Sequence, residues 1–307
     1  MTRFFVAALG LDAPGTYRTA LLTTLAMLAF AANSLLCRLA LRDDAIDPAS
    51  FASARVIAGA LTLVLIALPR WRRHVAPKPN WWATAMLFAY MVCFSFSYLT
   101  LNAGTGALIL FGAVQITMFV VALRAGETFA PMAWTGFLLA VSGMIYLVLP
   151  GLAAPDPMGA ALMAIAGLAW GLYTWFGRRV LDPLEGTAMN FIYAVPPVIV
   201  GSVMFVDVFN VSPVGLVLAA LSGAVTSGLG YAIWYTAVKG LNGTTAATVQ
   251  LSVPVIAAFG GLALLAEPLT LRLMVASLAT LGGIAIVLLQ KPKKAEQEVF
   301  LEAGINI

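Results

Sequence analysis

The sequence predicts an all-α integral membrane protein with ten transmembrane helices, arranged as two inverted repeats of five helices. Hydrophobic residues make up 62% of the 307 residues and charged residues only 10%, and the mean hydropathy is +0.97. So few polar residues cannot cover a water-soluble globule, whereas runs of about 20 apolar residues fit a hydrocarbon core about 30 Å thick. A further observation is an internal repeat at an offset of 140 residues.

The spans of the first half are separated by polar or proline-rich segments. We expect them at 19–41, 49–68, 81–100, 103–123 and 131–149, after a surface segment at 1–18. A basic loop from Arg70 to Pro79 ends the second span. Trp81 and Trp82 then mark a membrane interface, Asn102 is expected to cap the fourth span, and Pro131 opens the fifth.

A connector rich in Pro, Gly and Asp, from Pro150 to Pro157, separates the two halves. Five further spans are expected at 158–180, 187–206, 213–238, 243–264 and 270–290. The predicted division is therefore a first repeat at 19–150 and a second repeat at 151–290. Residues 291–307 form a charged tail without a long apolar face, and we expect this tail to be disordered.

The internal repeat is clearest between residues 102–127 and 242–267, two apolar runs that each begin with Asn and end with Glu. Because each half contains an odd number of spans, the second half must cross the membrane in the opposite sense. Substrate sites in such inverted repeats tend to lie near the midplane, between the halves. At an offset of 140, the matches are Asn102 with Asn242, Thr105 with Thr245, Glu127 with Glu267, Arg38 with Arg178, and Gly143 with Gly283.

Basic residues are distributed unequally between the two sides of the predicted membrane. Thirteen of the 17 Lys and Arg residues fall on the side that carries both termini, which makes this side cytoplasmic by the positive-inside rule. Only four residues fall on the outer side: Arg38, Arg42, Arg55 and Arg272.

Several function classes lack the residues they need. The basic residues lie between apolar runs and form no stripe, which argues against nucleic-acid binding. His74 is the single histidine and lies in a basic loop, so neither a metal site nor a catalytic base is expected. We therefore expect no enzyme activity, no catalytic residues and no cofactor, although a membrane-embedded enzyme remains the alternative class.

The repeated helix also carries the motif by which the chain resembles a known family. Residues Ala246-Ala247, Pro254 and Glu267-Pro268-Leu269-Thr270 resemble the EamA-type repeat of the drug/metabolite transporter superfamily. Within it the chain is most similar to aromatic amino-acid exporters of the YddG type. The first half departs from the pattern, because Val114 stands where proline is usual. The resemblance implies a bacterial inner-membrane exporter whose cavity is formed by spans 1, 3, 4, 6, 8 and 9.

Polar and aromatic residues near the membrane midplane are the candidate substrate contacts. Buried amides either join helices or face a wet cavity, and for Asn33, Gln115 and Gln250 both interpretations stay open. An amide both donates and accepts, which suits a zwitterion, and aromatic side chains suit an apolar substrate group. The substrate-binding candidates are Asn33, Tyr90, Phe94, Tyr98, Gln115, Trp170, Tyr173, Trp234 and Gln250.

Charged residues are expected at span ends, where they stabilise the structure or gate the cavity. Glu127 and Glu267 would satisfy loop backbone or pair with Arg124 or Arg272. Arg55 would extend toward the membrane surface, pair with one of the aspartates at 43, 44 and 47, or gate the outer mouth.

No Asp or Glu lies in the middle of a predicted span, whereas an antiporter of lipophilic cations needs a buried carboxylate. The sequence therefore predicts export of small neutral metabolites, chiefly aromatic and other apolar amino acids, by alternating access. Facilitated efflux is favoured over tight proton coupling. Export of another metabolite or of drugs is the alternative within the superfamily. The expected partners are the lipid bilayer and a small-molecule substrate, and a monomer is compatible with the sequence.

Overall fold

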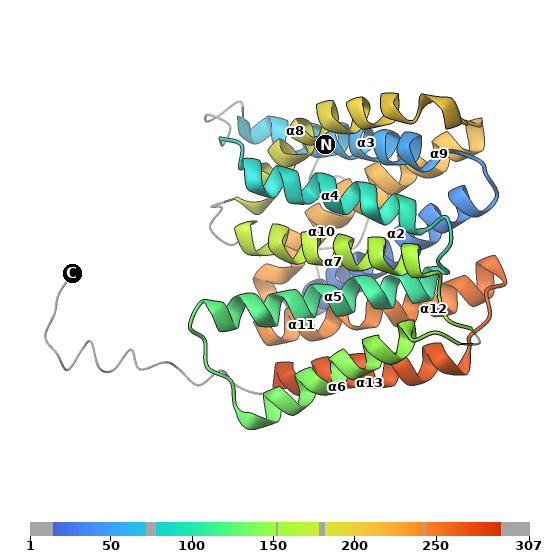
Figure 1. Cartoon of the computed structure of the whole chain (residues 1–307). Coiled ribbons are helices and arrows are strands. Elements are labelled where there is room, and N and C mark those ends of the chain that lie inside the picture. Colours follow the sequence, from blue (N-terminus) through green and yellow to red (C-terminus); the bar gives the residue numbers. More distant parts are fainter. Residues whose placement is uncertain (1–14, 72–77, 152, 178–181, 242, 290–307) are drawn as a thin grey trace, which may run out of the picture.

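A computed structural model describes residues 15–71, 78–151, 153–177, 182–241 and 243–289, and these form a bundle of helices (Figure 1). Nine helical segments of this described part are long and apolar enough to cross a membrane, and Trp81–Ser97 is a shorter apolar helix. The predicted fold class is confirmed. The first-half helices are α2 (Gly15–Arg42), α3 (Pro48–Trp71), α4 (Trp81–Ser97), α5 (Ala103–Arg124) and α6 (Pro131–Val148).

The second half also has five helical segments, but two of them are interrupted. Its uninterrupted helices are α7 (Pro157–Gly177), α8 (Pro183–Met204) and α13 (Leu271–Leu289). The eighth span runs through α9 (Pro213–Leu221), the π-helix η2 (Ser222–Leu229), α10 (Gly230–Ala237) and the short η3 (Val238–Gly240). The ninth consists of α11 (Gly243–Gln250) and α12 (Ser252–Leu265), and the single turn η1 (Val206–Val208) follows α8.

The interruption of the ninth span follows from Pro254. A proline inside a helix has no N–H to donate, and its ring collides with the carbonyl four residues earlier. That carbonyl belongs to Gln250, the last residue of α11, and Leu251 separates α11 from α12. The matching helix α5 has Val114 at the equivalent position and is continuous. Valine in place of the usual proline at position 114 therefore accounts for the continuity of α5.

Two helix starts differ from the sequence expectation. Helix α8 begins at Pro183, not 187, because Asp182 caps it by accepting hydrogen bonds from the Leu184 and Glu185 N–H groups (3.0 and 3.2 Å). Glu185 thus lies buried in the first turn of a helix. At α5, Asn102 makes no side-chain capping bond, and the expectation that it caps this helix is wrong.

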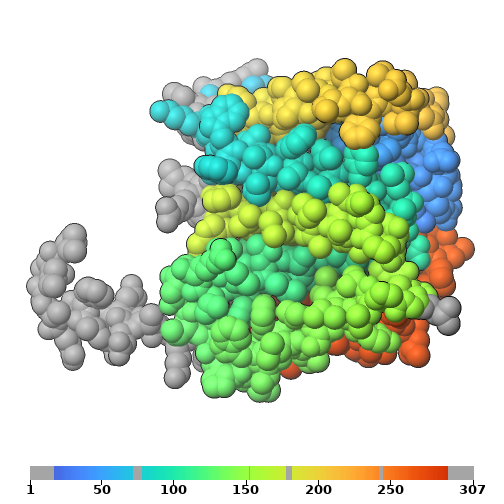
Figure 2. Space-filling model, in the orientation of Figure 1, coloured from blue at the N-terminus to red at the C-terminus, as the bar shows by residue number. Residues whose placement is uncertain are grey.

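Helices from the two halves pack against one another throughout the bundle (Figure 1). Helix α4 packs against α7 and, correspondingly, α10 packs against α2, while α5 packs against both α7 and α12. Helices α3 and α8 pair at one edge, and α6 and α13 pair at the other. Figure 2 shows one face on which α4, α5 and α6 of the first half lie beside α7 and α8 of the second. The halves are therefore interleaved and do not form separate bundles.

The contact between α6 and α13 displays the repeat at the level of single residues. A Cβ at Gly143 would lie 2.8 Å from the Thr280 nitrogen, and one at Gly283 would lie 2.5 Å from the Ala140 nitrogen. Gly143 and Gly283 are separated by 140 residues, as are Ala140 and Thr280. The two close approaches are thus the same contact made twice, as a two-fold relation between the halves requires.

Candidate functional site

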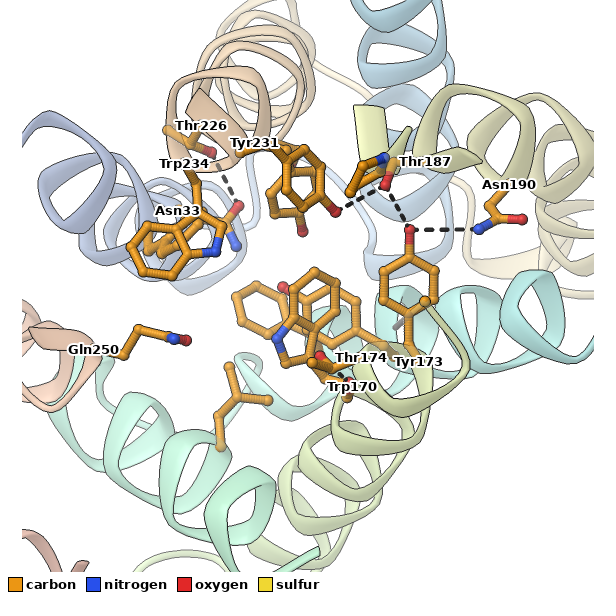
Figure 3. A pocket seen from close by; sticks show the side chains of 18 of the residues that line it. Asn33, Trp170, Tyr173, Thr174, Thr187, Asn190, Thr226, Tyr231, Trp234 and Gln250 are labelled. Carbon is orange, nitrogen blue, oxygen red and sulfur yellow. Dashed lines mark hydrogen bonds between the residues drawn. The ribbon is translucent and has the colours of Figure 1, made fainter. Parts of the chain in front are cut away.

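A cavity of about 290 Å³ lies between the helices of both halves (Figure 3). Its volume is at the lower end of the range for small-molecule sites. Residues from α2, α4, α5, α7, η2, α10 and α11 line it, in agreement with the six spans that the family resemblance implies. Helix α8 also contributes, through Pro183, Gly186, Thr187 and Asn190, because its early start brings these residues into the bundle.

Most of the predicted substrate contacts meet at this cavity. Two do not: Tyr98 is fully buried with its hydroxyl near the Ala103 carbonyl (3.4 Å), and Gln115 is half-buried outside the lining. The predicted residues that line the cavity are Asn33, Tyr90, Phe94, Trp170, Tyr173, Trp234 and Gln250.

The cavity wall itself follows the repeat. Positions separated by 140 residues contribute in pairs, so that corresponding faces of the two halves point at the same space. This is the location near the pseudo-twofold axis that an inverted repeat predicts. The pairs are Phe30 with Trp170, Asn33 with Tyr173, Ser34 with Thr174, Phe94 with Trp234, and Leu110 with Gln250.

Trp170 is the centre of an aromatic cluster on this wall. It stacks against Tyr231 (centroids 5.4 Å apart, planes 23°) and against Tyr173 (5.1 Å, 27°), and it lies 4.8 Å from Tyr90. Phe30 contacts both Tyr231 and Trp234. Flat rings presented to a cavity give a large apolar contact for a planar or aliphatic group.

A chain of hydroxyls crosses one side of the cavity (Figure 3). The Tyr173 hydroxyl donates to Thr187 Oγ1 (3.0 Å), which also bonds the Tyr235 hydroxyl (2.8 Å). Asn190 Nδ2 approaches the Tyr173 hydroxyl at 3.5 Å. The sequence interpretation missed Thr187, because it placed this residue at the end of a span and α8 in fact starts four residues earlier.

Two of the three amides that line the cavity, Asn33 and Gln250, have different kinds of partner. Asn33 Oδ1 accepts from Ser222 (2.7 Å) and Thr226 (3.2 Å) of η2, so Asn33 both joins helices and lines the cavity. Gln250 Nε2 donates to the Ala246 carbonyl of its own helix (3.1 Å), and the Gln250 side chain extends toward the cavity (Figure 3). Its carbonyl oxygen has no hydrogen-bond partner within the described residues and is available as an acceptor.

Arg55 lies deep in the bundle, and the expectation that it pairs with a nearby aspartate is wrong. The side chain is fully buried; Nη2 donates to the Tyr90 hydroxyl (2.9 Å) and Nε approaches Ser227 Oγ (3.4 Å). The aspartates have other partners: Asp47 accepts from the Ser50 N–H, and Asp43 pairs with Arg42. In that loop, the hydrogen bond from Arg42 holds the pKa of Asp43 below its usual value.

The cavity mouth is the end of the bundle at which Gly177, Pro183 and Val238 line the cavity. Glu267 lies at the opposite end, called the closed end here, and its carboxylate joins two helices there. Its Oε1 accepts from Arg38 Nε (3.1 Å), so Glu267 pairs with Arg38 and not with Arg272. Its Oε2 accepts from the Ala103 N–H (2.8 Å) at the start of α5, in place of the expected Asn102 cap.

The other charged residues singled out from the sequence take different positions. Arg38 Nη1 also donates to the carbonyls of Tyr98 and Leu99 (3.0 and 2.9 Å), at the same closed end as Glu267. Arg272 donates to the Leu149 carbonyl, after α6. Glu127, the repeat counterpart of Glu267, is exposed.

These features are typical of one class of membrane protein. Within the described residues, nine helical segments long enough to cross a membrane and the shorter α4 form a bundle around a central cavity, whose aromatic and hydroxyl wall reaches one end of the bundle. Within the described residues, no group of three or more His, Cys, Asp or Glu side chains is placed to hold a metal ion. A membrane transporter with a central substrate cavity is the class that this arrangement supports.

Comparison with known proteins identifies the family. Residues 157–289 match the model of the EamA-like transporter family. An uncharacterized protein of Pseudomonas aeruginosa is 50% identical over 92% of this chain and 98% of its own length. Two uncharacterized transporters of Archaeoglobus fulgidus are 24% and 23% identical, over 79% and 87% of this chain and 89% and 96% of their own lengths. The chain belongs to the EamA-like transporters, within the drug/metabolite transporter superfamily.

The fold is shared with solved structures. One crystal structure, at 17% sequence identity, superposes with a TM-score of 0.59 over 87% of this chain and 98% of its own. This likeness concerns the fold alone.

Proposed function

We propose that this protein exports small neutral metabolites, chiefly aromatic and other apolar amino acids, across the bacterial inner membrane by alternating access. The observation that carries the proposal is the cavity between the two halves, which combines the stacked rings of Trp170, Tyr173 and Tyr231 with the amides of Asn33 and Gln250. The rings suit an apolar side chain, and the amides supply both donors and acceptors for an amino acid.

The closed end and the cavity mouth support a transport cycle with two states. Both termini are proposed to lie in the cytoplasm, on the side to which the positive-inside bias assigns them. The cavity reaches the bundle end where α7 stops at Gly177 and α8 starts at Pro183, which is that same end. The contacts of Glu267 and Arg38 join α2, α5 and the loop after α12 at the other end. The structure then corresponds to a cytoplasm-facing state.

Facilitated efflux is proposed in preference to tight proton exchange. A proton-coupled carrier needs a group on the transport path that gains and loses a proton, most often a carboxylate. The cavity lining contains no Asp, Glu or His within the described residues.

Export of a different metabolite or of drugs within the same superfamily is the second candidate. The family assignment supports it to the same degree, because the relatives' names give no substrate.

Counterflow in proteoliposomes tests the proposal. Purified protein is reconstituted in vesicles loaded with unlabelled phenylalanine, and uptake of labelled phenylalanine is followed with and without an imposed pH gradient. We expect uptake, competition by tryptophan and methionine, and no acceleration by the gradient. Absence of uptake together with failure of phenylalanine, tryptophan, methionine and threonine to compete would reject amino-acid transport. Clear acceleration by the gradient would instead reject only the facilitated mechanism.

A further inference from the structure

Arg55 carries a buried positive charge for which the described part of the protein provides no acidic partner. The guanidinium is fully buried, and its Nη1 has no hydrogen-bond partner among the described residues. Arginine stays protonated in proteins, so this charge cannot be removed by titration. A buried charge of this kind is costly unless an anion offsets it. The Arg55 charge therefore favours the binding of an anionic group close to it.

The position of Arg55 is fixed by its neighbours. Gly223 of η2 packs directly on the α3 backbone, where a Cβ would lie 2.9 Å from the Arg55 carbonyl carbon. The guanidinium lies over the rings of Phe94 (4.6 Å) and Tyr90 (5.3 Å), an arrangement that stabilises a cation. These contacts hold Arg55 directly behind the cavity, since Phe94, Tyr90 and Ser227 all line it.

The two hydroxyls between Arg55 and the cavity each have a proton to donate. Tyr90 and Ser227 both use their oxygen atoms as acceptors for Arg55 N–H groups. A hydroxyl that accepts in this way still carries its own hydrogen, and no acceptor for either hydrogen is found among the described residues. Two O–H donors with a positive charge behind them form a receptor for the two oxygens of a carboxylate.

We propose that Tyr90 and Ser227 bind the carboxylate group of the substrate, and that Arg55 acts from behind as the positioning residue that supplies the charge. This inference rests on the proposed function and specifies which group of the substrate is recognised: the carboxylate is required, and the amine is dispensable. The substrate's apolar group packs on Trp170, whose ring lies 4.8 Å from that of Tyr90. A cation without a carboxylate meets the charge of Arg55 and binds poorly.

The experiment compares three ligands that share one ring: phenylalanine, 3-phenylpropanoate with only the acid, and phenethylamine with only the amine. Each is tested as a competitor of phenylalanine counterflow and as a stabiliser of the purified protein against heat. We expect 3-phenylpropanoate to bind within about tenfold of phenylalanine, and phenethylamine to bind at least about tenfold more weakly than the acid, as expected for loss of a hydrogen bond to a charged group.

Tyr90→Phe and Ser227→Ala each remove one donor and leave Arg55 in place. Each is expected to weaken binding of 3-phenylpropanoate by about tenfold and to leave phenethylamine unchanged. Arg55→Gln is expected to abolish the preference for the acid. The acid-to-amine ratio is the decisive readout, because a general folding defect lowers both affinities together. Tyr193→Phe and Ser53→Ala are the controls, since both hydroxyls lie outside the cavity lining and the ratio should not change.

Equal competition by the acid and the amine would overturn the carboxylate site, as would an unchanged ratio in both hydroxyl variants. Phenylalanine transport would survive either result, so the proposed function would stand. Absence of both phenylalanine counterflow and thermal stabilisation by all three ligands would overturn the proposed function and this inference together.

Discussion

Glu267 is predicted to hold the bundle shut at the end away from the cavity mouth. Its carboxylate bonds Arg38 of α2 through one oxygen and the Ala103 N–H of α5 through the other. Glu267→Gln keeps an acceptor for the Ala103 N–H but removes the charge that pairs with Arg38. Glu267→Ala removes both contacts. Comparison of the two variants therefore separates the ion pair from the helix cap.

The size of the effect follows from burial. The side chains of Arg38 and Glu267 are 12% and 8% exposed, so the pair is largely desolvated. Removal of one member of a buried pair costs about 3–5 kcal/mol. Arg38 keeps its bonds to the carbonyls of Tyr98 and Leu99, so we expect about 2–3 kcal/mol for the Gln variant. Loss of the cap adds about 1 kcal/mol in the Ala variant.

Cys37 provides the assay. It is fully buried beside Arg38, and its repeat counterpart is Gly177, which lines the cavity mouth. When the two halves exchange roles, Cys37 is expected to face the open cavity and to react with a maleimide. In a Cys93→Ala background, Glu267→Gln should raise the rate of Cys37 modification by roughly 50-fold, the factor that corresponds to about 2.3 kcal/mol.

The matched control is Glu127→Gln. Glu127 is the repeat counterpart of Glu267 but is exposed, so its replacement should change the rate by no more than about twofold. If Cys37 reacted at the wild-type rate in both Glu267 variants, the reasoning that these contacts close this end of the bundle would be refuted.

Three further predictions concern the interrupted span, the lining amide and the helix crossing. Pro254→Ala should allow α11 and α12 to join into one helix, which raises the free energy of unfolding by up to about 3 kcal/mol. It should also lower counterflow, because joining the helices displaces Gln250 from the cavity. Unchanged counterflow would contradict this prediction. Gln250→Ala should lower counterflow with the protein still folded, whereas Gln115→Ala, outside the lining, should not. Gly283→Val should lower the thermal midpoint, because a Cβ there meets the Ala140 backbone. The control is Gly282→Val, since a Cβ at Gly282 has no neighbour within 4 Å among the described residues. Equal thermal midpoints for the two variants would contradict the close packing of α6 on α13.

The sequence was sufficient to predict the spans and many of the residues that line the cavity. Membrane spans require long apolar runs, which are visible in the sequence. The internal repeat is found by comparing the sequence with itself, so both features can be predicted from the sequence. Pairs such as Asn33 with Tyr173 and Phe94 with Trp234 reach the cavity because corresponding faces of the two halves face one axis. The pattern of polar and aromatic residues at midplane depth therefore located them.

The wrong predictions concern side chains or backbone groups whose hydrogen-bond partners lie far away in the sequence. Asn102 has the residue type and position of a helix cap, yet the first N–H of α5 is taken by Glu267, 164 residues later. Arg55 has aspartates close by in sequence, yet its side chain points into the bundle toward Tyr90. Local rules weigh only neighbours, and a long side chain in a membrane protein is directed by the packing of helices that those rules do not see.

The residues of the proposed carboxylate site differ in type between the two halves. Arg55 corresponds to Val195 at the offset of 140, Tyr90 corresponds to Gly230, and Ser227 corresponds to Leu87. None of these counterparts offers a charge or a side-chain hydroxyl, so the repeat cannot build the site a second time. Pairs that match across the repeat, such as Gly143 with Gly283, serve packing, which both halves need. A carrier that binds one carboxylate in a cavity shared by two halves needs this asymmetry, because a second buried guanidinium would repel the first.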